Sequence, residues 1–587
     1  MKASSMISLL LMWVLISGAY IPQLTPKNVS AGSTMEWTWK YETNSTVKGI
    51  SITDDGKYIG AYDYANNIYL FEADTGSLVK TWQFGAEVKG IKIAKKADPP
   101  LLFVSDNKSV RVYRQDMNVP ARVYSPNIPL AYGWNASQPR PGNITGFDIS
   151  ADGKLLMVTY YYRWGNVWKY NVSMYNVETG TEMWNYQAQF SDAKAKYGLS
   201  ASYDGKFFVV GVSETDTYVR IELYERDSPY GPKWQSDRLR DNLGSGYLSR
   251  ITALSISNDG SVIMVGTNNA VLKFIQTQNV EVWRVDGIRD PVAISMNYSG
   301  SEGIVAFYNQ KLDKHMISFM DLATMNDSKR IKWNWSTPDD NRIVNAVMDK
   351  EGQYIVVSTA KNMWLIYAPV HKAFRSIQLS TDFELVSNID LSRDSADRVA
   401  LGAAYREIDN PAGVYMFDNP KAIKPQPCEI FGFFDVTTTS MNVTWGVSTA
   451  PDFQQYELYC DPNLNVISTN PQNAEKHFVI TNKDKNYQQV TGLQPGTTYF
   501  FKLRVVCITE LYADSQVKQK MTEVPPPPPD YTPYIVAAVV VTALVIFLLW
   551  YFYLRHKIPE WKEKRKKKGK GVAWHQRPGE YLPPGFE

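Results

Sequence analysis

A pattern of apolar and polar positions recurs along most of this 587-residue chain. In each copy, apolar and polar residues alternate, the alternation breaks at Asp-Gly or a similar pair, and a run rich in β-branched and aromatic residues follows. This pattern predicts two antiparallel strands joined by a tight hairpin turn. Four copies are clear: Ile50 to Gly60, Phe147 to Met157, Leu199 to Val209 and Leu254 to Met264.

Four weaker copies complete the repeat. They run from Val88 to Tyr124, Pro291 to Trp335, Arg342 to Gln378 and Leu385 to Asn419. A third strand and a fourth strand, which usually carries Trp, follow the hairpin, and we expect these Trp residues to pack between neighbouring units. Four short strands per unit in eight units predict an all-β fold, an eight-bladed β-propeller over residues 36–419.

The two ends of the repeat predict how the ring closes. The last unit stops after its third strand, Gly413 to Phe417, and a strand with the composition of a fourth strand, Glu36 to Tyr41, precedes the first unit. A ring with an open seam leaves unpaired strand edges. We therefore expect the N-terminal strand to pair into the last blade.

The ends of the chain predict a single-pass membrane protein. Residues 1–19 have the features of a signal peptide: Lys2, an apolar run from Met6 to Ile16, and small residues before a cleavage point after Ala19. Residues 535–554 carry no charge and span about 30 Å as a helix, enough to cross a hydrocarbon core. The tail, residues 555–587, is strongly basic, which predicts a cytoplasmic C-terminus, an extracellular N-terminus at the plasma membrane, and attraction to anionic lipid.

Two sets of residues carry a resemblance to known propeller families. Asp74-Thr-Gly76 with Trp82, and Glu178-Thr-Gly180 with Trp184, resemble the repeats of quinoprotein-like propellers, and the Asp-Gly hairpins resemble WD40-type blades. The resemblance covers residues 36–419 and implies the fold. The quinoprotein likeness also implies a dehydrogenase, but the cofactor-binding residues of those enzymes, which include adjacent cysteines in many members, have no match here. We therefore expect no cofactor.

A second module follows the propeller. Leu493-Gln-Pro495-Gly-Thr-Thr-Tyr499 and the alternating strands around it resemble a fibronectin type III domain. The resemblance implies a β-sandwich over residues 426–522 with Tyr499 as its tyrosine corner. The Pro-rich residues 523–534 predict an extended spacer before the membrane.

The three cysteines, Cys428, Cys460 and Cys507, all lie in this second module. Composition allows any of three pairings or three reduced thiols. The strand order that the fibronectin resemblance implies puts Cys428 and Cys507 at one pole of the sandwich and Cys460 at the other. We therefore expect a disulfide between Cys428 and Cys507, with three buried reduced thiols as the alternative.

Glycosylation is predicted on the part of the chain that topology places outside the cell. Every Asn-x-Ser/Thr sequon lies there, and each is an acceptor where its asparagine is exposed. The ten sequons are at Asn28, Asn44, Asn107, Asn135, Asn143, Asn171, Asn297, Asn326, Asn334 and Asn442.

The sequence contains no pattern typical of a catalytic or metal site. The five histidines are scattered, and no Gly-x-Ser-x-Gly elbow, phosphate-binding loop or Cys-x-x-Cys pair occurs. Acidic pairs such as Asp54-Asp55 lack the spacing of an EF-hand. We expect no enzyme activity, no bound metal and no nucleic-acid partner.

One face of the predicted propeller concentrates long loops. The turns between second and third strands and the connections between blades share this face, opposite the Asp-Gly hairpins. Tyr, Trp and Arg dominate binding hot spots, and aromatic faces stack on sugar rings. The candidate ligand-binding residues are Tyr132, Trp134, Arg140, Tyr162, Arg163, Trp164 and Trp168, and a third loop adds Arg238, Arg240 and Tyr247. The alternative is that these residues only hold the loops to the propeller.

Together these features predict a membrane-anchored extracellular binding or scaffold protein that recognises a surface protein or a glycan through its propeller. Two alternatives come from other classes. One is a propeller enzyme, of the quinoprotein redox type or cleaving glycans. The other is a surface receptor that signals through a recruited partner, because the 33-residue tail is too short for a catalytic domain.

Overall fold

The structure is a computed structural model of the chain. It describes residues 37–125, 143–164, 167–187, 193–194, 198–214, 218–240, 247–324, 329–339, 341–378, 386–394, 396–403, 412–419, 424–450 and 452–565. The predicted signal peptide and residues 566–587 of the predicted tail lie outside these ranges.

The described residues between 39 and 418 form eight antiparallel sheets, which follow one another along the chain. The first contains β2 (Val47–Ile52), β3 (Tyr58–Asp63), β4 (Asn67–Glu72) and β5 (Leu78–Gln83). The second contains β6 (Gly90–Ile93), β7 (Leu101–Ser105), β8 (Val110–Arg114) and β9 (Arg122–Tyr124). The third contains β10 (Asn143–Ile149), β11 (Leu155–Trp164), β12 (Val167–Asn176) and β13 (Thr181–Gln187). In the fourth, β14 (Ala193–Lys194) and β15 (Leu199–Ala201) both pair with β16 (Phe207–Glu214), and β17 (Tyr218–Glu225) and β18 (Trp234–Gln235) follow.

The second half of the propeller repeats this arrangement. The fifth sheet contains β19 (Ile251–Ile256), β20 (Val262–Thr267), β21 (Ala270–Ile275) and β22 (Gln278–Asp286). The sixth contains β23 (Ala293–Met296), β24 (Glu302–Asn309), β25 (Lys314–Asp321) and β26 (Ile331–Ser336). The seventh contains β27 (Ile343–Met348), β28 (Tyr354–Thr359), β29 (Asn362–Tyr367) and β30 (Lys372–Gln378), with the short helix η2 (Ala368–Val370) before β30. The eighth contains β31 (Val386–Leu391), β32 (Arg398–Ala403), β33 (Gly413–Asp418) and β1 (Trp39–Glu42).

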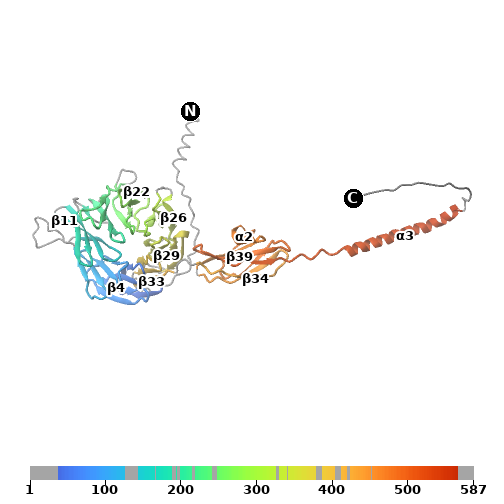
Figure 1. Cartoon of the computed structure of the whole chain (residues 1–587), viewed down its shortest axis with the longest axis horizontal. Helices are drawn as coiled ribbons and strands as arrows, with labels where there is room; N and C mark the ends of the chain where they lie inside the picture. The colour runs from blue at the N-terminus through green and yellow to red at the C-terminus, as the bar shows by residue number, and fades with distance from the viewer. Residues whose placement is uncertain are drawn as a thin grey trace, which may run out of the picture. The chain divides into compact units, whose positions relative to one another are not determined.

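These sheets form a ring. The first strands of neighbouring sheets lie side by side around a central axis, and β31 of the eighth sheet lies beside β2 of the first. Figure 1 shows the sheets in circular order, from β4 through β11, β22, β26 and β29 to β33. The fold of this part of the chain is therefore a β-propeller, as the repeat predicted.

The N-terminal strand completes the eighth sheet. Strand β1 pairs antiparallel with β33, with Trp39 opposite Met416 and Glu42 opposite Gly413. A Cβ atom added at Gly413 would clash with the Tyr41 carbonyl, so glycine permits this close approach. The predicted pairing of an N-terminal strand into the last blade is confirmed, with the strand at 39–42.

The repeated Trp residues link neighbouring sheets, as predicted. Four of them project from an outer strand and donate the indole Nε1–H to a backbone carbonyl in the turn of the next sheet. The four bonds are Trp39 to Ala73 at 2.7 Å, Trp82 to Met117 at 2.8 Å, Trp184 to Arg226 at 2.8 Å and Trp234 to Gln276 at 2.7 Å. Each of these four Trp side chains thus fills apolar space between two sheets while its one polar atom is satisfied.

The turns between first and second strands share one set of hydrogen bonds. In the third sheet, Ser150 Oγ donates to Asp152 Oδ1 at 2.6 Å, and the backbone N–H of Lys154 donates to the same oxygen at 3.0 Å. Gly153 has a φ of 71°, a left-handed conformation that favours glycine. The same contacts recur through Asp55, Asp204 and Asp259. Turn geometry therefore accounts for the repeated Asp-Gly pairs.

The second module has the two sheets of a β-sandwich. One contains β34 (Ile430–Phe434), β35 (Ser440–Trp445) and β38 (Tyr487–Thr491). The other contains β37 (Lys476–Ile480), β36 (Phe453–Asp461), β39 (Thr498–Cys507), β40 (Tyr512–Asp514) and β41 (Lys518–Met521), with α2 (Leu464–Thr469) and η3 (Pro471–Asn473) after β36. The hydroxyl of buried Tyr499 accepts a hydrogen bond from the Gln494 N–H at 3.0 Å. This contact fits the predicted tyrosine corner.

The predicted disulfide between Cys428 and Cys507 is not present. All three cysteines are free and buried. Burial raises the pKa of Cys428 as well as that of Cys507, and the Asp452 carboxylate also acts to raise the pKa of Cys507. Burial raises the pKa of Cys507 to about 12, which disfavours the thiolate that disulfide exchange requires. The structure thus has the alternative arrangement, three buried thiols.

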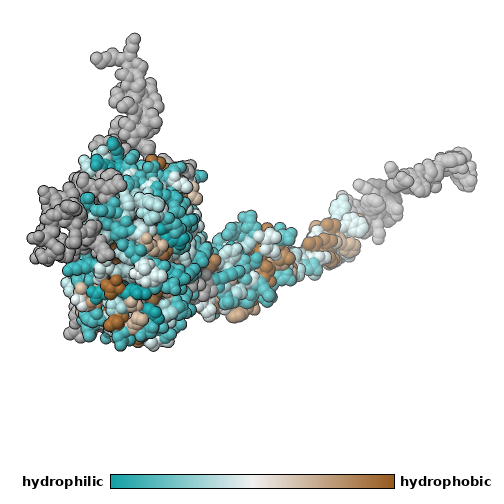
Figure 2. Space-filling model, turned by 60° about the vertical axis from the view of Figure 1, so that its left-hand side comes forward, coloured by the Kyte–Doolittle hydropathy of each residue, from teal (hydrophilic) through white to brown (hydrophobic). Residues whose placement is uncertain are grey.

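Helix α3 (Thr532–Arg565) follows the sandwich and contains the predicted span 535–554. Its residues Thr532–Arg555 are, within the described part of the chain, the one helix long and apolar enough to cross a membrane. Hydrophobic side chains are visible along this helix in Figure 2, whereas most of the propeller surface in that view is hydrophilic. These features support a single-pass membrane protein.

Candidate functional site

The propeller has two faces of different construction. We call the face that carries the turns between first and second strands the hairpin face, and the opposite face the insertion face. On the insertion face, connections between sheets bond to the turns beside them: Ile144 N donates to Asn107 O at 2.9 Å, and Ser249 N donates to Asn268 Oδ1 at 3.1 Å. Among the long loops noted in the sequence, residues 236–240 and 247–249 and the end of the hairpin formed by β11 and β12 belong to this insertion face, whereas residues 126–142 lie outside the described ranges.

Of the candidate binding residues of the third sheet, Tyr162 is buried. Tyr162 is 3% exposed, and its hydroxyl accepts a hydrogen bond from Gln187 Nε2 at 2.6 Å. Burial raises the pKa of Tyr162 to about 12. Tyr162 therefore packs within its sheet, as the alternative interpretation of the loop aromatics expected.

Three other candidate residues, Arg163, Trp164 and Trp168, lie at the end of the hairpin formed by β11 and β12. Arg163 pairs with Trp168 in the strand register, and Trp164 pairs with Val167. Only the backbone of these residues is described. Tyr132, Trp134 and Arg140 lie outside the described residues.

A cluster of two tyrosines and two arginines lies on the insertion face at the fourth sheet. The rings of Tyr218 and Tyr247 meet edge to face with centroids 4.6 Å apart. The Arg238 guanidinium lies 4.5 Å from the Tyr218 centroid, and that of Arg240 lies 4.9 Å from the Tyr247 centroid. We call these four residues the arginine–tyrosine cluster. Tyr247 is 37% exposed and both arginines are exposed, so the cluster presents aromatic and cationic surface to solvent.

The sequence pointed to three members of this cluster and missed Tyr218. Arg238, Arg240 and Tyr247 belong to the connection between the fourth and fifth sheets, whereas Tyr218 is the first residue of β17. Its position at the start of a third strand was the available signal, because this end of the hairpin formed by β16 and β17 also lies on the insertion face.

A buried charged group lies within the same hairpin. Glu222 on β17 is fully buried, and its Oε2 accepts hydrogen bonds from the hydroxyls of Tyr170 at 2.5 Å and Tyr224 at 2.7 Å. Arg220 Nη2 lies 3.1 Å from Glu222 Oε1. Burial raises the pKa of Glu222. These contacts join the third and fourth sheets beneath the extended hairpins and so fix the strand that carries Tyr218.

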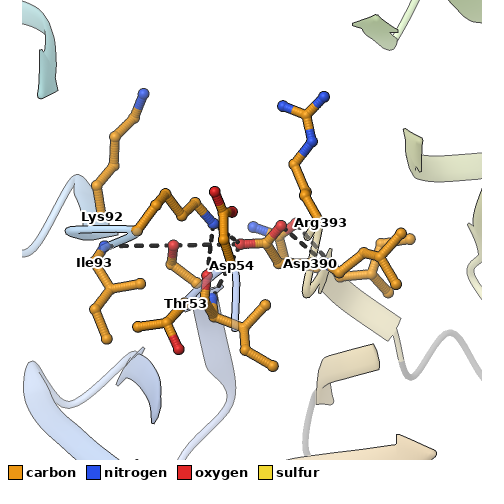
Figure 3. Close-up of polar contacts among 12 residues, drawn as sticks. Thr53, Asp54, Lys92, Ile93, Asp390 and Arg393 are labelled. Atoms are coloured by element: carbon orange, nitrogen blue, oxygen red, sulfur yellow. Dashed lines mark hydrogen bonds and ion pairs between the residues drawn. The ribbon is translucent and has the colours of Figure 1, made fainter. Parts of the chain in front are cut away.

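Polar side chains from separate sheets meet along the axis (Figure 3). Asp390 on β31 accepts hydrogen bonds from the Ile52 N–H at 3.1 Å and from Lys95 Nζ at 2.9 Å. Lys92 pairs with Asp148 at 2.6 Å. These bonds connect the eighth sheet with the first two, and the second with the third.

A second axial group closes the hairpin face. Asp54 of the first sheet is 1% exposed and accepts hydrogen bonds from the hydroxyls of Tyr203 at 2.7 Å and Tyr298 at 2.5 Å, which come from the fourth and sixth sheets. The two rings lie 5.2 Å apart. Burial and the Asp54 carboxylate raise the pKa of both tyrosines. We call these three residues the axial cluster, and its contacts join sheets that are not neighbours.

Exposure divides the predicted glycosylation sites. Asn171, Asn297 and Asn442 are only 2%, 5% and 8% exposed, and their side-chain amides donate hydrogen bonds within the fold. A glycan does not fit at these three positions, because it would displace buried contacts. The exposed sequons among the described residues are Asn44, Asn107, Asn143 and Asn334. Asn28, Asn135 and Asn326 lie outside the described residues.

The titratable side chains do not gather as metal ligands do. Across the ranges that the structure describes, no group of three or more His, Cys, Asp or Glu side chains could hold a metal ion.

Comparison with known proteins identifies the family of the second module. Residues 426–516 match the fibronectin type III domain family and lie within the predicted 426–522. Among solved structures, the chain is similar to the crystal structure of the C-terminal WD40 domain of Sif2. That similarity has a TM-score of 0.47 and 11% sequence identity, and covers 66% of this chain and 99% of the other. No curated protein matches the chain.

Proposed function

We propose that this protein is a membrane-anchored extracellular binding or scaffold protein, and that the insertion face of its propeller recognises a surface protein or a glycan. A propeller combined with a fibronectin type III domain suggests an interaction or scaffold role. The apolar helix provides the anchor, and the basic residues after it favour a cytoplasmic C-terminus.

The arginine–tyrosine cluster is the observation that carries this proposal. Tyr and Arg are the side chains most enriched at binding hot spots, because they combine a large apolar area with directional hydrogen bonding. Here each guanidinium already lies over a tyrosine ring, which limits the side-chain entropy that a partner would have to remove. The cluster is therefore a preorganised and exposed contact surface.

The test is capture of membrane proteins or glycans by the full-length protein, solubilised from the cells that produce it. The variant Arg240→Ala with Tyr247→Ala removes one arginine–tyrosine pair of the cluster. Because a central anchor contributes about 2 kcal/mol or more to binding, we expect capture to fall by more than tenfold while the protein remains folded.

The matched control changes the hairpin face. Asp152→Asn with Asp204→Asn keeps the turn geometry, since Asn tolerates the same turns. We expect this variant to capture partners as well as the unchanged protein. Equal capture by both variants would contradict a binding role for the insertion face.

A further inference from the structure

The contact between the sixth and seventh sheets differs from the other Trp contacts. Here the ring of His371 stacks on Trp333 with centroids 5.1 Å apart and an interplanar angle of 30°. Phe319 stacks on Trp333 with centroids 4.9 Å apart and an angle of 12°. Three aromatic rings thus form a stack whose outermost member, His371, is exposed.

A cavity of about 300 Å³, partly open to solvent, lies against this stack. It is bounded by the start of β26, the turn before β28 and helix η2. The polar side chains that line it are Glu302, Lys332, Glu351, Gln353 and His371. The cavity is large enough for a single sugar ring, since small-molecule pockets begin at about 300 Å³.

Glycine at position 352 keeps this cavity open. A Cβ atom added there would lie 2.7 Å from Glu302 Oε2, and the backbone φ of 77° also disfavours any other residue. The other oxygen of Glu302 pairs with Lys332 Nζ at 2.7 Å. Glu302 is therefore held against the turn, with one carboxylate oxygen directed at Gly352.

His371 supplies the aromatic platform. Its backbone φ of 59° is left-handed, which is uncommon for a residue other than Gly, Asn or Asp. Its backbone N–H donates to Ala368 O at 3.2 Å, which fixes the ring position relative to η2. Burial lowers the pKa of His371, which favours the neutral imidazole, a form that can both donate and accept hydrogen bonds.

We propose that this cavity binds one pyranose ring of a neutral glycan. The stacked His371 ring offers an aromatic face to the sugar, and the carboxylate of Glu351 and the amide of Gln353 offer partners to its hydroxyls. Two carboxylates against one lysine disfavour an anionic ligand. The Lys332 ammonium disfavours the alternative cationic ligand, an arginine of a partner protein.

This inference rests on the proposed binding function and adds to the insertion face a separate sugar site on the hairpin face, beside the turn at Gly352. Its failure is distinguishable from failure of the insertion-face proposal, because the two sites lie on different turns and are tested by different variants. Changes to His371 leave the arginine–tyrosine cluster intact.

The test measures sugar binding by saturation-transfer NMR with the full-length chain, in a detergent without a sugar headgroup. The probes are the methyl glycosides of glucose, galactose, mannose and N-acetylglucosamine. We expect at least one to bind saturably at about millimolar concentration, the range of a single shallow site. His371→Asn tolerates the left-handed backbone but lacks the ring, and we expect it to weaken binding by tenfold or more. Glu351→Gln tests the carboxylate and should weaken binding by a smaller factor.

Two controls address nonspecific effects. His477 also stacks on an aromatic ring, Tyr459, with centroids 4.6 Å apart, and His477→Asn should leave binding unchanged. Asp204 occupies the turn position equivalent to Glu351, and Asp204→Asn should also have no effect. The proposal is overturned if none of the four glycosides binds saturably, if His371→Asn binds them unchanged, or if N-acetylarginine amide binds in their place.

Discussion

The two faces of the propeller are made by the same strands but use their polar residues differently. On the hairpin face, Asp and Ser side chains of the short turns form hydrogen bonds within the same turn, and the Asp54 carboxylate accepts hydrogen bonds from two tyrosine hydroxyls. On the insertion face, Arg240 and Tyr247 stay exposed although they contact each other. The difference indicates that the turns around the axis on the hairpin face contribute mainly to stability, whereas the exposed cluster on the insertion face is available for recognition.

The largest expected loss of folding stability affects both faces of the propeller. Deletion of residues 37–43 removes β1 and exposes the edge of β33 in the eighth sheet. Because every sheet packs against two neighbours, we expect the whole ring to lose stability, on the order of 5 kcal/mol or more, instead of one sheet fraying. Thermal unfolding of the full-length protein measures this change. An unchanged melting temperature would contradict closure by β1.

A smaller loss of folding stability should follow from a change in the axial cluster alone. Asp54→Ala removes the buried carboxylate that accepts hydrogen bonds from the hydroxyls of two half-buried tyrosines, and we expect a cost of about 2 kcal/mol. Denaturant unfolding of the purified chain gives the free energy. The contrasting variant Tyr247→Ala on the insertion face should cost under about 1 kcal/mol. Similar losses in the two variants would remove the distinction between the faces.

The axial tyrosines also predict a dependence on pH. The pKa values of Tyr203 and Tyr298 are raised above the ordinary 10.0 in the folded protein, so their contribution is fully present below pH 10. Above about pH 10 the unfolded chain ionises more readily, and stability falls. Tyr203→Phe with Tyr298→Phe should be less stable at pH 8 but lose less between pH 10 and about 11. If stability falls equally with pH in the double variant and in the unchanged protein, the two tyrosines do not cause the pH dependence.

The smallest expected effect on stability concerns the glycans. Mass spectrometry after enzymatic deglycosylation should find modified asparagine at positions 44, 107, 143 and 334, and unmodified asparagine at 171, 297 and 442. Modification at any buried position would contradict the fold there. The absence of modification at all four exposed positions would contradict an extracellular propeller. Glycans at Asn44, Asn107 and Asn143 would confine a partner to the remaining insertion face.

Features that depend on neighbouring residues were predictable from the sequence. The Asp-Gly turns and the Trp of each outer strand repeat with the blade, and the incomplete last repeat implied the partner of β1. The axial cluster was not predictable, because Asp54 meets Tyr203 and Tyr298 across 149 and 244 residues. The buried position of Tyr162 was not predictable for a different reason. Residues 160–162 are all tyrosine, so apolar alternation could not show which side of β11 faces inward.

The position of β33 between β1 and β32 has a mechanical consequence. The chain passes from β33 toward the fibronectin type III domain and the membrane helix, so tension applied through the anchor reaches the propeller at this strand. Two ladders of backbone hydrogen bonds hold β33, one on each side, and the contact between Thr38 and Asp418 joins segments 380 residues apart. A pull on the C-terminal side therefore loads both flanking strands together, and detaching the propeller's last strand requires both ladders to break.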